Sequence, residues 1–364
     1  MILFPLNLTV NCAPNFRYDY DDDFFVTWST NLANSKIHSD VYSISYGAAE
    51  YFLVGQSYAN SFNTEIMKVC AMGVTVLVST GDDGAAGFRY RSSATSSCAY
   101  DPEFPATSPY VTAVGATMGA EKGNTEVACQ KDMGALITSG GGFSTLFSAF
   151  SQQQSAIQSY FQRVSTQPYR GYNKSGRGIP DVSLAGHSYV VVNAGKLTVN
   201  DGTSASTPAV AGMISLMNAA RRAAGMSPVG WLNPALYASQ GSFANDITSG
   251  NNKCTESRCC LQGFYAAPGW DPVTGFGSVD FRKLYNLLVP TSASSPSPTL
   301  VPNAPPFRMS SSPTSPTNRP SVSPSAARPT VPTRTPSSPS KRPSVNQSTG
   351  KSPAPTPSPN SISS

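Results

Sequence analysis

The chain has 364 residues, a formal net charge of +5, and only 12% charged residues. Its charge is unevenly placed: residues 291–364 hold seven basic residues and no acidic one, which leaves residues 1–290 with a net charge of −2. The basic balance therefore gives no indication of nucleic-acid binding by the larger part of the chain.

Composition divides the chain near residue 290. Residues 291–364 consist mostly of Ser, Pro and Thr, and such a segment cannot bury enough apolar surface to fold. We expect it to be a disordered tail, and residues 1–290 to form one domain with a sizeable core. No stretch of the sequence is long and apolar enough to cross a membrane as a helix. Residues 1–14 lack the basic start and the cleavage site of a signal peptide.

Seven cysteines are compatible with an oxidising compartment. Their connectivity cannot be read from sequence, but we expect Cys98 to pair with Cys129 and one or two links to form within residues 254–260. Cys70 lies on a predicted helix, where we expect a buried free thiol. The 254–260 cluster is a weak candidate for zinc, because no second pair of ligands follows at a suitable spacing. Glycosylation sequons, meaningful only in a secreted protein, begin at Asn7, Asn173 and Asn346.

Alternating strand and helix signals follow in chain order. Residues 15–40 hold an acidic cluster among aromatic residues, and we interpret them as a solvated loop. Residues 41–46 are β-branched and aromatic and predict a short strand. Residues 60–72 place apolar side chains at helical spacing, and residues 74–79 form a continuous apolar run typical of a buried parallel strand. Strand, helix and strand make a βαβ unit, so the predicted fold class is α/β.

The second predicted strand ends in the sequence Thr80-Gly81-Asp82-Asp83-Gly84. Open α/β sheets place their chemistry at the carboxyl ends of strands. An Asp between glycines in that position is either a turn former, which is the common case, or a functional acid.

A serine precedes the strongest helix signal of the chain. Gly202, Thr203 and Ser204 lead to Pro208 and then to a small, apolar run over residues 209–224. The run predicts a buried helix with Pro208 in its first turn. Ser204 would lie at the helix N-terminus, where unpaired N–H groups and the helix dipole favour a developing negative charge. That position suits the nucleophile of an acyl transfer; the alternative is a Ser/Thr-rich loop that caps the helix.

Two carboxylates frame a Gly/Pro-rich loop near the end of the predicted domain. Asp246-Ile247 comes first, and Gly269-Trp270-Asp271-Pro272 follows. Backbone carbonyls turn inward readily in such a loop, and calcium binds a mixture of carboxylate and carbonyl oxygens. Without a metal the segment is a surface turn.

Taken together, these segments resemble the sedolisins, the serine-carboxyl peptidases of the subtilisin-like fold. G-T-S-A-S-T-P around Ser204 is similar to their nucleophile motif, and G-D-x-G around Asp82 to their oxyanion motif. Subtilisins, in contrast, use a histidine base and usually carry a His shortly after the Pro, whereas Ala209 follows Pro208 here. Further stretches that are similar to the family are residues 102–106, 109–117, 139–144 and 177–182. The resemblance implies a mainly parallel central sheet with helices on both faces.

The resemblance also implies roles for individual residues. Ser204 would attack the substrate, and Asp82 would stabilise the oxyanion; a carboxyl can donate that hydrogen bond only while protonated, so the enzyme should work in acid. Ser45, Tyr46 and Gly47 would pair with an extended substrate. The implied calcium ligands are the side chains of Asp246 and Asp271 and the main-chain oxygens of Ile247, Ala267 and Gly269.

The catalytic base of the family is not found in this sequence. In sedolisins a Glu and an Asp lie four residues apart on a helix, several tens of residues before the Ser-Tyr-Gly segment. No Glu precedes Ser45 here, and Asp19 and Asp23 lie too close to that segment. We therefore expect the N-terminal part of the catalytic domain to be missing, and the 364-residue chain alone to hydrolyse peptides poorly or not at all.

Two hypotheses of function follow from the sequence. The first is an acid-acting, tripeptidyl-peptidase-like serine peptidase with bound calcium, which releases tripeptides or cleaves internally. The alternative is a catalytically inactive peptidase-like module for binding or adhesion. We expect a monomer that acts on peptides or unfolded proteins, has no nucleic-acid partner, and is secreted or lysosomal.

Overall fold

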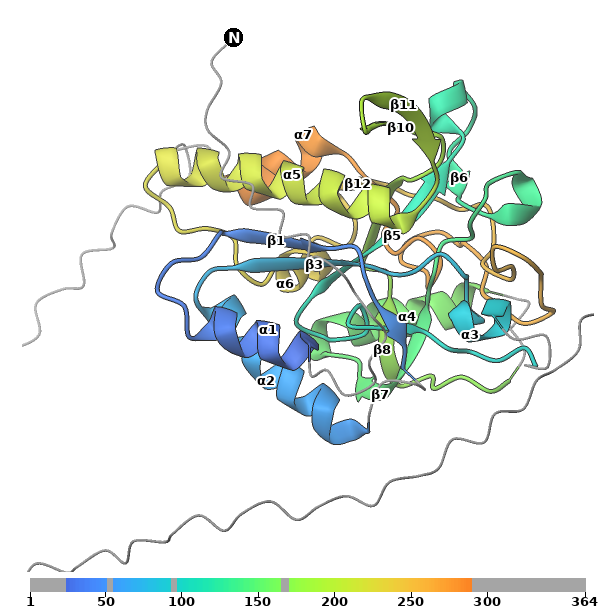
Figure 1. Cartoon of the computed structure of the whole chain (residues 1–364), viewed down its shortest axis with the longest axis horizontal. Helices are drawn as coiled ribbons and strands as arrows, with labels where there is room; N and C mark the ends of the chain where they lie inside the picture. Colours follow the sequence, from blue (N-terminus) through green and yellow to red (C-terminus); the bar gives the residue numbers. More distant parts are fainter. Residues whose placement is uncertain (1–23, 51–54, 93–96, 165–169, 290–364) are drawn as a thin grey trace, which may run out of the picture. The chain divides into compact units, whose positions relative to one another are not determined.

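The computed structural model describes residues 24–50, 55–92, 97–164 and 170–289. At its centre lies a sheet with the strand order β1-β3-β5-β9-β13-β12, to which β6 adds by pairing with β5 (Figure 1). Strands β1, β3, β5, β9 and β13 run parallel to their neighbours, whereas β12 and β6 are antiparallel. The predicted mainly parallel central sheet is thus confirmed. The strands are β1 (Val41–Ile44), β3 (Thr75–Ser79), β5 (Thr112–Met118), β6 (Val127–Ala128), β9 (Val182–Ala185), β12 (Ala244–Asn245) and β13 (Ser278–Val279).

Helices cover both faces of this sheet. Helix α5 (Thr203–Ala223) runs along one face in contact with β1, β3, β5 and β9, and α1 (Phe24–Ala33) and α2 (Gln56–Ala71) pack together on the other (Figure 1). The contacts of β3 explain why the centre of the strand is apolar. Leu77 belongs to the core cluster that contains α5, whereas Val76 and Val78 belong to the cluster under α1 and α2. A strand that is buried on both faces favours successive apolar residues, and only the two end residues of β3, Thr75 and Ser79, are polar.

Shorter elements complete the described part of the chain. They are β2 (Ala48–Ala49), α3 (Gly87–Ser92), β4 (Glu103–Phe104), η1 (Ala120–Lys122), η2 (Lys131–Met133), β7 (Gly142–Ser148), α4 (Ser151–Arg163), β8 (Gly176–Ile179), β10 (Tyr189–Asn193), β11 (Lys196–Asn200), α6 (Asn233–Ala238) and α7 (Phe281–Leu288). Strands β2 and β4 pair with each other, as do β7 with β8 and β10 with β11. Within the described ranges no helix is both long and apolar enough to span a membrane.

Two predicted boundaries were wrong. Residues 24–33 form helix α1 instead of continuing the predicted loop: their intrinsic helix propensity is low, but Phe25, Ser29 and Leu32 repeat at helical spacing and are buried. Helix α2 begins at Gln56, four residues before the predicted start.

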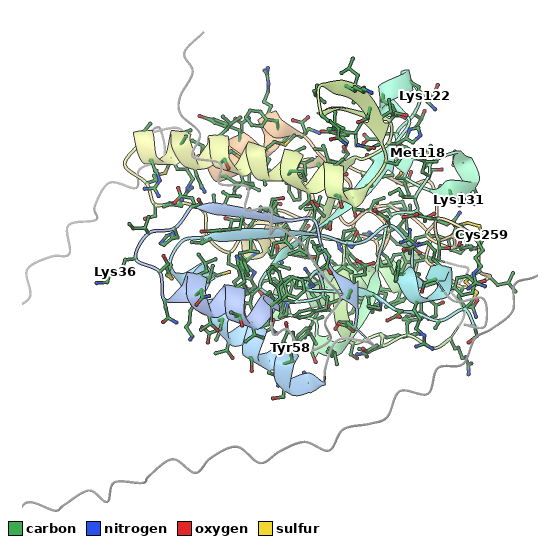
Figure 2. The ribbon with its side chains drawn as sticks, in the orientation of Figure 1. Lys36, Tyr58, Met118, Lys122, Lys131 and Cys259 are labelled. Carbon is green, nitrogen blue, oxygen red and sulfur yellow. A yellow bond between two sulfur atoms is a disulfide. The ribbon has the colours of Figure 1, made fainter. Side chains whose placement is uncertain are left out.

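The cysteines confirm one predicted link, within residues 254–260, and contradict the other. Cys98 is bonded to Cys260, not to Cys129, and Cys254 is bonded to Cys259. Cys129 stays a free thiol because it is buried in a small apolar cluster beside β5 and β6. Figure 2 shows Cys259 and the yellow disulfide sulfurs at one end of the sheet region. Cys70 is free as predicted but only half-buried, and burial raises the pKa of its thiol to about 12.

Candidate active site

The segment that carries Ser204 is fixed to the carboxyl end of the central sheet. The Gly202 N–H donates to the Gly186 carbonyl just beyond β9 (2.8 Å), and the Ser206 hydroxyl donates to the Leu184 carbonyl within it (2.9 Å). Ser206 is buried, whereas Ser204 is exposed. The sequence therefore orients one serine into the protein as an anchor and the other outward, at the second position of α5.

Helix α5 begins at Thr203, so Ser204 lies at the helix N-terminus as predicted, whereas Pro208 lies in the second turn and not in the predicted first turn. Proline has no N–H to donate to the carbonyl four residues earlier, which here is that of Ser204. The Ser45 hydroxyl donates to this freed Ser204 carbonyl instead (3.1 Å). Because of Pro208, the Ser204 carbonyl is available to accept a hydrogen bond from the segment after β1. This bond connects that segment to Ser204, the predicted nucleophile.

Asp82 follows β3 and lies against the same helix N-terminus. Its Oδ1 accepts hydrogen bonds from the Thr203 N–H (2.8 Å) and from the Thr203 hydroxyl (2.9 Å). A Cβ built on Gly202 would lie 3.5 Å from Asp82 Oδ2, so the second oxygen faces the residue just before Thr203 and Ser204. Burial raises the pKa of the Asp82 carboxyl, although the two Thr203 donors lower it in part. The acid is therefore held beside Ser204 in a setting that favours its protonated form.

The glycine-rich stretch before β7 lets two loops approach closely. The Gly140 N–H donates to the Gly81 carbonyl (2.8 Å), and a Cβ on Gly140 would lie 2.0 Å from the Thr80 carbonyl oxygen. The Thr138 N–H donates to the Asp82 carbonyl (2.9 Å). Only residues without a side chain allow this backbone contact, so the stretch supports the loop that carries Asp82.

Ser45, Tyr46 and Gly47 extend past the end of β1, which is the outermost strand of the sheet next to β3. Ser45 and Tyr46 are exposed. Beyond Ile44 the chain does not continue the ladder with β3. The predicted substrate-pairing segment is thus accessible and linked to the nucleophile segment through Ser45.

Within the described part of the chain, no carboxylate or imidazole forms a hydrogen bond with the Ser204 hydroxyl. His187 interacts with Glu121 (Nδ1 to Oε1, 2.5 Å) and lies near Asp201 (Nε2 to Oδ2, 3.7 Å). Asp19 and Asp23 lie outside the described residues. In the sequence they are four residues apart, as in the family's catalytic pair, but too close to the Ser-Tyr-Gly segment.

Sequence reasoning missed two glutamates near this site. Glu50 is buried, and both oxygens of its carboxyl accept hydrogen bonds. The Ser144 hydroxyl donates to one (2.5 Å), and the Thr145 N–H (2.6 Å) and hydroxyl (2.7 Å) donate to the other, so Glu50 fixes β7. The carboxyl of Glu103 packs against the main chain beside Asp82: a Cβ on Gly81 would lie 2.3 Å from Glu103 Cδ. Its only signal in the sequence was membership of a stretch similar to the family.

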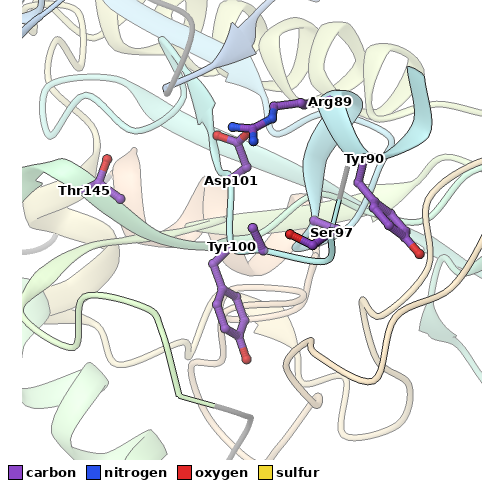
Figure 3. Close-up of a pocket in the computed structure, with 8 residues that line it drawn as sticks. Arg89, Tyr90, Ser97, Tyr100, Asp101 and Thr145 are labelled. Atoms are coloured by element: carbon purple, nitrogen blue, oxygen red, sulfur yellow. The ribbon is translucent and has the colours of Figure 1, made fainter. Parts of the chain in front are cut away.

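A separate cavity of about 120 Å³ lies next to α3. Tyr90, Tyr100, Asp101 and Thr145 are among its lining residues, and Arg89 and Asp101 extend toward one another within it (Figure 3). Neither Ser204 nor Asp82 lines it, so this cavity is distinct from the candidate active site.

Two of the predicted calcium ligands, the side chains of Asp246 and Asp271, both accept hydrogen bonds from the loop before Asp271. The Gly269 N–H donates to Asp246 Oδ2 (2.7 Å), and the Ala267 N–H donates to Asp271 Oδ2 (2.9 Å). The two carboxylates thus converge on one loop, and Ile247 follows Asp246 directly. Asp271 is fully buried, and burial raises the pKa of its carboxyl to about 8.

The surroundings of these residues fit a divalent cation. Among the described residues no basic side chain forms an ion pair with Asp246 or Asp271. The Asp271 carboxyl instead accepts hydrogen bonds from three N–H groups, those of Ala267, Val273 and Thr274, and from the Thr274 hydroxyl. The same residues contain no group of three or more His, Cys, Asp or Glu side chains that could bind a metal. A cation here would therefore depend on main-chain oxygens as well as the two carboxylates, which is a ligand set typical of calcium.

Asp181 is structural. It is fully buried and accepts hydrogen bonds from Arg177 (2.6 Å), the Ala113 N–H (2.7 Å) and the Tyr237 hydroxyl (2.8 Å). These bonds connect the turn between β8 and β9 to β8, β5 and α6.

Comparison with known proteins relates this architecture to peptidases. Residues 22–231 match the model of the subtilase family. Tripeptidyl-peptidase 1 of Macaca fascicularis is 38% identical over 275 residues, covering 73% of this chain and 46% of that protein. Physarolisin of Physarum polycephalum is 37% identical over 298 residues, covering 72% of this chain and 52% of that protein. The chain thus spans about half the length of these relatives.

A solved structure shares the fold. Pseudomonas sedolisin, a serine-carboxyl proteinase complexed with two molecules of pseudo-iodotyrostatin, matches with a TM-score of 0.57 at 26% sequence identity. The match covers 71% of this chain and 67% of that structure.

Proposed function

This chain belongs to the subtilase family and, within it, is a member of the sedolisins, and from that premise we propose that the protein is an acid-acting serine peptidase. The observation that carries the proposal is the pair of hydrogen bonds from Thr203 to Asp82. They hold a carboxyl with a raised pKa beside a serine at the start of a helix.

In the proposed mechanism the Ser204 hydroxyl attacks the carbonyl carbon of a peptide bond. The negative charge that develops on the carbonyl oxygen is stabilised by the protonated Asp82 carboxyl and by the N–H groups at the N-terminus of α5. The amine leaves, and water then hydrolyses the acyl-enzyme to restore Ser204. Proton transfer to and from Ser204 is assigned to the Glu/Asp pair of the family, which has no counterpart among the described residues.

The proposed substrate is a peptide or an unfolded protein bound in extended form along Ser45, Tyr46 and Gly47. Tripeptidyl-peptidase 1, which the chain resembles, supports release of tripeptides as the reaction. An acidic, secreted or lysosomal location is proposed on two grounds. The raised pKa of Asp82 favours activity in acid, and the two disulfides require an oxidising compartment.

Calcium is the proposed structural cofactor. The residues that would hold it are Asp246, Ile247, Ala267, Gly269 and Asp271, the first and last through their side chains and the others through main-chain oxygens. Bound calcium would supply the positive charge that buried Asp271 lacks. It would fix the loop before Trp270, which is itself fully buried in the core.

The proposal is tested at acid pH with the full-length protein, meaning here this chain joined to an N-terminal segment that carries the family's Glu/Asp pair, because the 364-residue chain alone is expected to hydrolyse peptides poorly or not at all. We expect fluorogenic peptides to be hydrolysed, Ser204→Ala to abolish hydrolysis, and Ser215→Ala to retain it. Ser215 is a matched control because it lies on the same helix and its hydroxyl bonds only to the Ala211 carbonyl (2.9 Å). If peptides bind but neither the parent nor Ser215→Ala cleaves them, the protein is a peptidase-like binding module instead.

A further inference from the structure

We propose that Glu103 forms the floor of the pocket for the P1 side chain, that is, the side chain of the residue whose carbonyl Ser204 attacks, and that it selects a cationic side chain, Lys or Arg. The inference rests on the proposed peptidase function and adds a substrate preference to it.

The carboxyl of Glu103 lies between two stretches of bare main chain. A Cβ built on Gly81 would lie 2.3 Å from Glu103 Cδ, and one built on Gly47 would lie 3.2 Å from Glu103 Oε2. The backbone of Glu103 is fixed by the pairing of β4 with β2, in which Glu103 lies opposite Ala49. Gly81 also has a φ of +92°, a conformation that other residues rarely adopt. Larger residues are therefore excluded at both glycines, and the Glu103 carboxyl lies against both of them.

The two glycines flank the reacting centre. Gly81 directly precedes Asp82, and Gly47 lies two residues after Ser45, whose hydroxyl contacts the Ser204 carbonyl. A substrate carbonyl held between Ser204 and Asp82 has its Cα beside these glycines. In an extended peptide successive side chains point to opposite sides, so the P1 side chain enters the space on one side of the segment while its neighbours point away. The Glu103 carboxyl lies where that side chain would end.

The charges around Glu103 favour a cation. Asp82, Asp83 and Asp101 are the acidic groups that act on its carboxyl, and Arg91 is the basic one. Arg91 is already paired with Asp83 (3.4 Å) and with Glu256. Among the described residues, no hydrogen bond or ion pair is made by the Glu103 carboxyl itself. An ammonium or guanidinium group would therefore find both a free acceptor and a negative potential.

The preference should depend on pH. Burial, and then the neighbouring carboxylates, raise the pKa of Glu103 to about 8. Below that pH the carboxyl is mainly neutral in the free protein, and a bound cation must first favour its ionisation. The advantage of a cationic P1 side chain should thus grow as the pH rises from acid toward 8.

The test measures binding, so it does not depend on turnover. In the full-length protein carrying Ser204→Ala, the affinities of two peptides that differ only at P1 are compared by calorimetry, one with Arg and one with uncharged, isosteric citrulline. At about pH 7.5 we expect the Arg peptide to bind about tenfold or more tightly, and at about pH 5 the ratio should shrink. Glu103→Gln should remove the preference, whereas Glu256→Gln, which removes an exposed charge nearby, should keep it.

Two results overturn the proposal: equal affinities for the two peptides in the Ser204→Ala protein, or an unchanged preference in Glu103→Gln. Should Glu103→Gln fail to fold, as judged by circular dichroism, Glu103→Met, which keeps the length of the side chain without its charge, takes its place in the same comparison, because Asp82 and Asp83 also have raised pKa values and a change with pH alone would not identify Glu103. Failure of the proposed function is a separate result: the protein with Ser204 intact binds the Arg peptide with the expected preference and does not cleave it.

Discussion

Replacing Glu103 with Gln should change how the stability of the protein depends on pH. The folded protein holds the proton of Glu103 more tightly than the unfolded chain, because its pKa is raised from an ordinary value of 4.5 to about 8. Such a group binds more protons in the folded state, so the free energy of unfolding falls as the pH rises from the unfolded toward the folded pKa. Gln never ionises and lacks this dependence.

The size of the effect follows from the two pKa values. Between about pH 4 and about pH 7, the wild-type protein should lose about 3 kcal/mol of unfolding free energy relative to Glu103→Gln. Two features of the structure make a large effect reasonable: the carboxyl is packed against Gly47 and Gly81, and Asp82 and Asp83 add like charges.

Urea denaturation of the wild type, Glu103→Gln and Glu256→Gln at the two pH values provides the assay. Glu256→Gln is the control for loss of a nearby carboxylate, because its side chain is 39% exposed and paired with Arg91, whereas Glu103 is packed against glycines. A constant difference between wild type and Glu103→Gln would refute the reasoning, since it would mean that Glu103 titrates alike in the folded and unfolded chains.

Three further predictions concern the site itself. Asp82→Asn should extend peptidase activity to higher pH. The wild-type carboxyl stops donating to the oxyanion as the pH rises through the raised pKa of Asp82, whereas the Asn amide keeps its N–H donor at every pH. A variant whose kcat/KM falls at the same pH as that of the wild type would contradict this. Chelation of calcium should lower the melting temperature of the wild type and of a control variant, Asp132→Asn, and should leave the melting temperature of Asp246→Asn unchanged. At a calcium concentration of about 100 Kd, bound calcium should raise the free energy of unfolding of the wild type by about 2.7 kcal/mol. Ser45→Ala should lower the unfolding free energy by about 0.5–1.5 kcal/mol, because the Ser204 carbonyl then has neither the serine nor a helix N–H as donor; an unchanged denaturation midpoint would show that water replaces the bond.

The sequence predicted those parts of the fold that depend on one strand or one loop. The apolar run of β3 required a strand covered on both faces, and the order of strand and helix signals required a parallel sheet. The Gly-Asp turn after β3 and the Ser204 motif were recognisable because each is contiguous. A shared site for the two was implied by the resemblance to the sedolisins, and Thr203 joins them in the structure.

Features that arise from contacts between distant residues were not predictable in the same way. Helix α1 forms against its intrinsic propensity because α2 covers Phe25 and Leu32. The disulfide between Cys98 and Cys260 joins residues 162 positions apart, and spacing carries no information about such a pair. Pro208 indicated the first turn of a helix, yet the helix begins at Thr203, and the Ser45 hydroxyl donates to the carbonyl that Pro208 leaves without its usual helix donor. Glu103 was hidden because its role depends on two glycines, each in a different loop.

The geometry at Asp82 explains how one carboxyl can be both fixed and ready to donate. Both donors of Thr203 are directed at Oδ1, which therefore acts as an acceptor. When the carboxyl is protonated, the proton resides most favourably on Oδ2, the oxygen that faces Gly202 and the start of α5. The same two bonds lower the pKa of Asp82, so burial must outweigh them for the acid to stay protonated, and the pKa is indeed raised. Orientation and protonation are thus set by different parts of the structure: Thr203 sets the first, and the packed loops around Gly81 and Gly140 set the second.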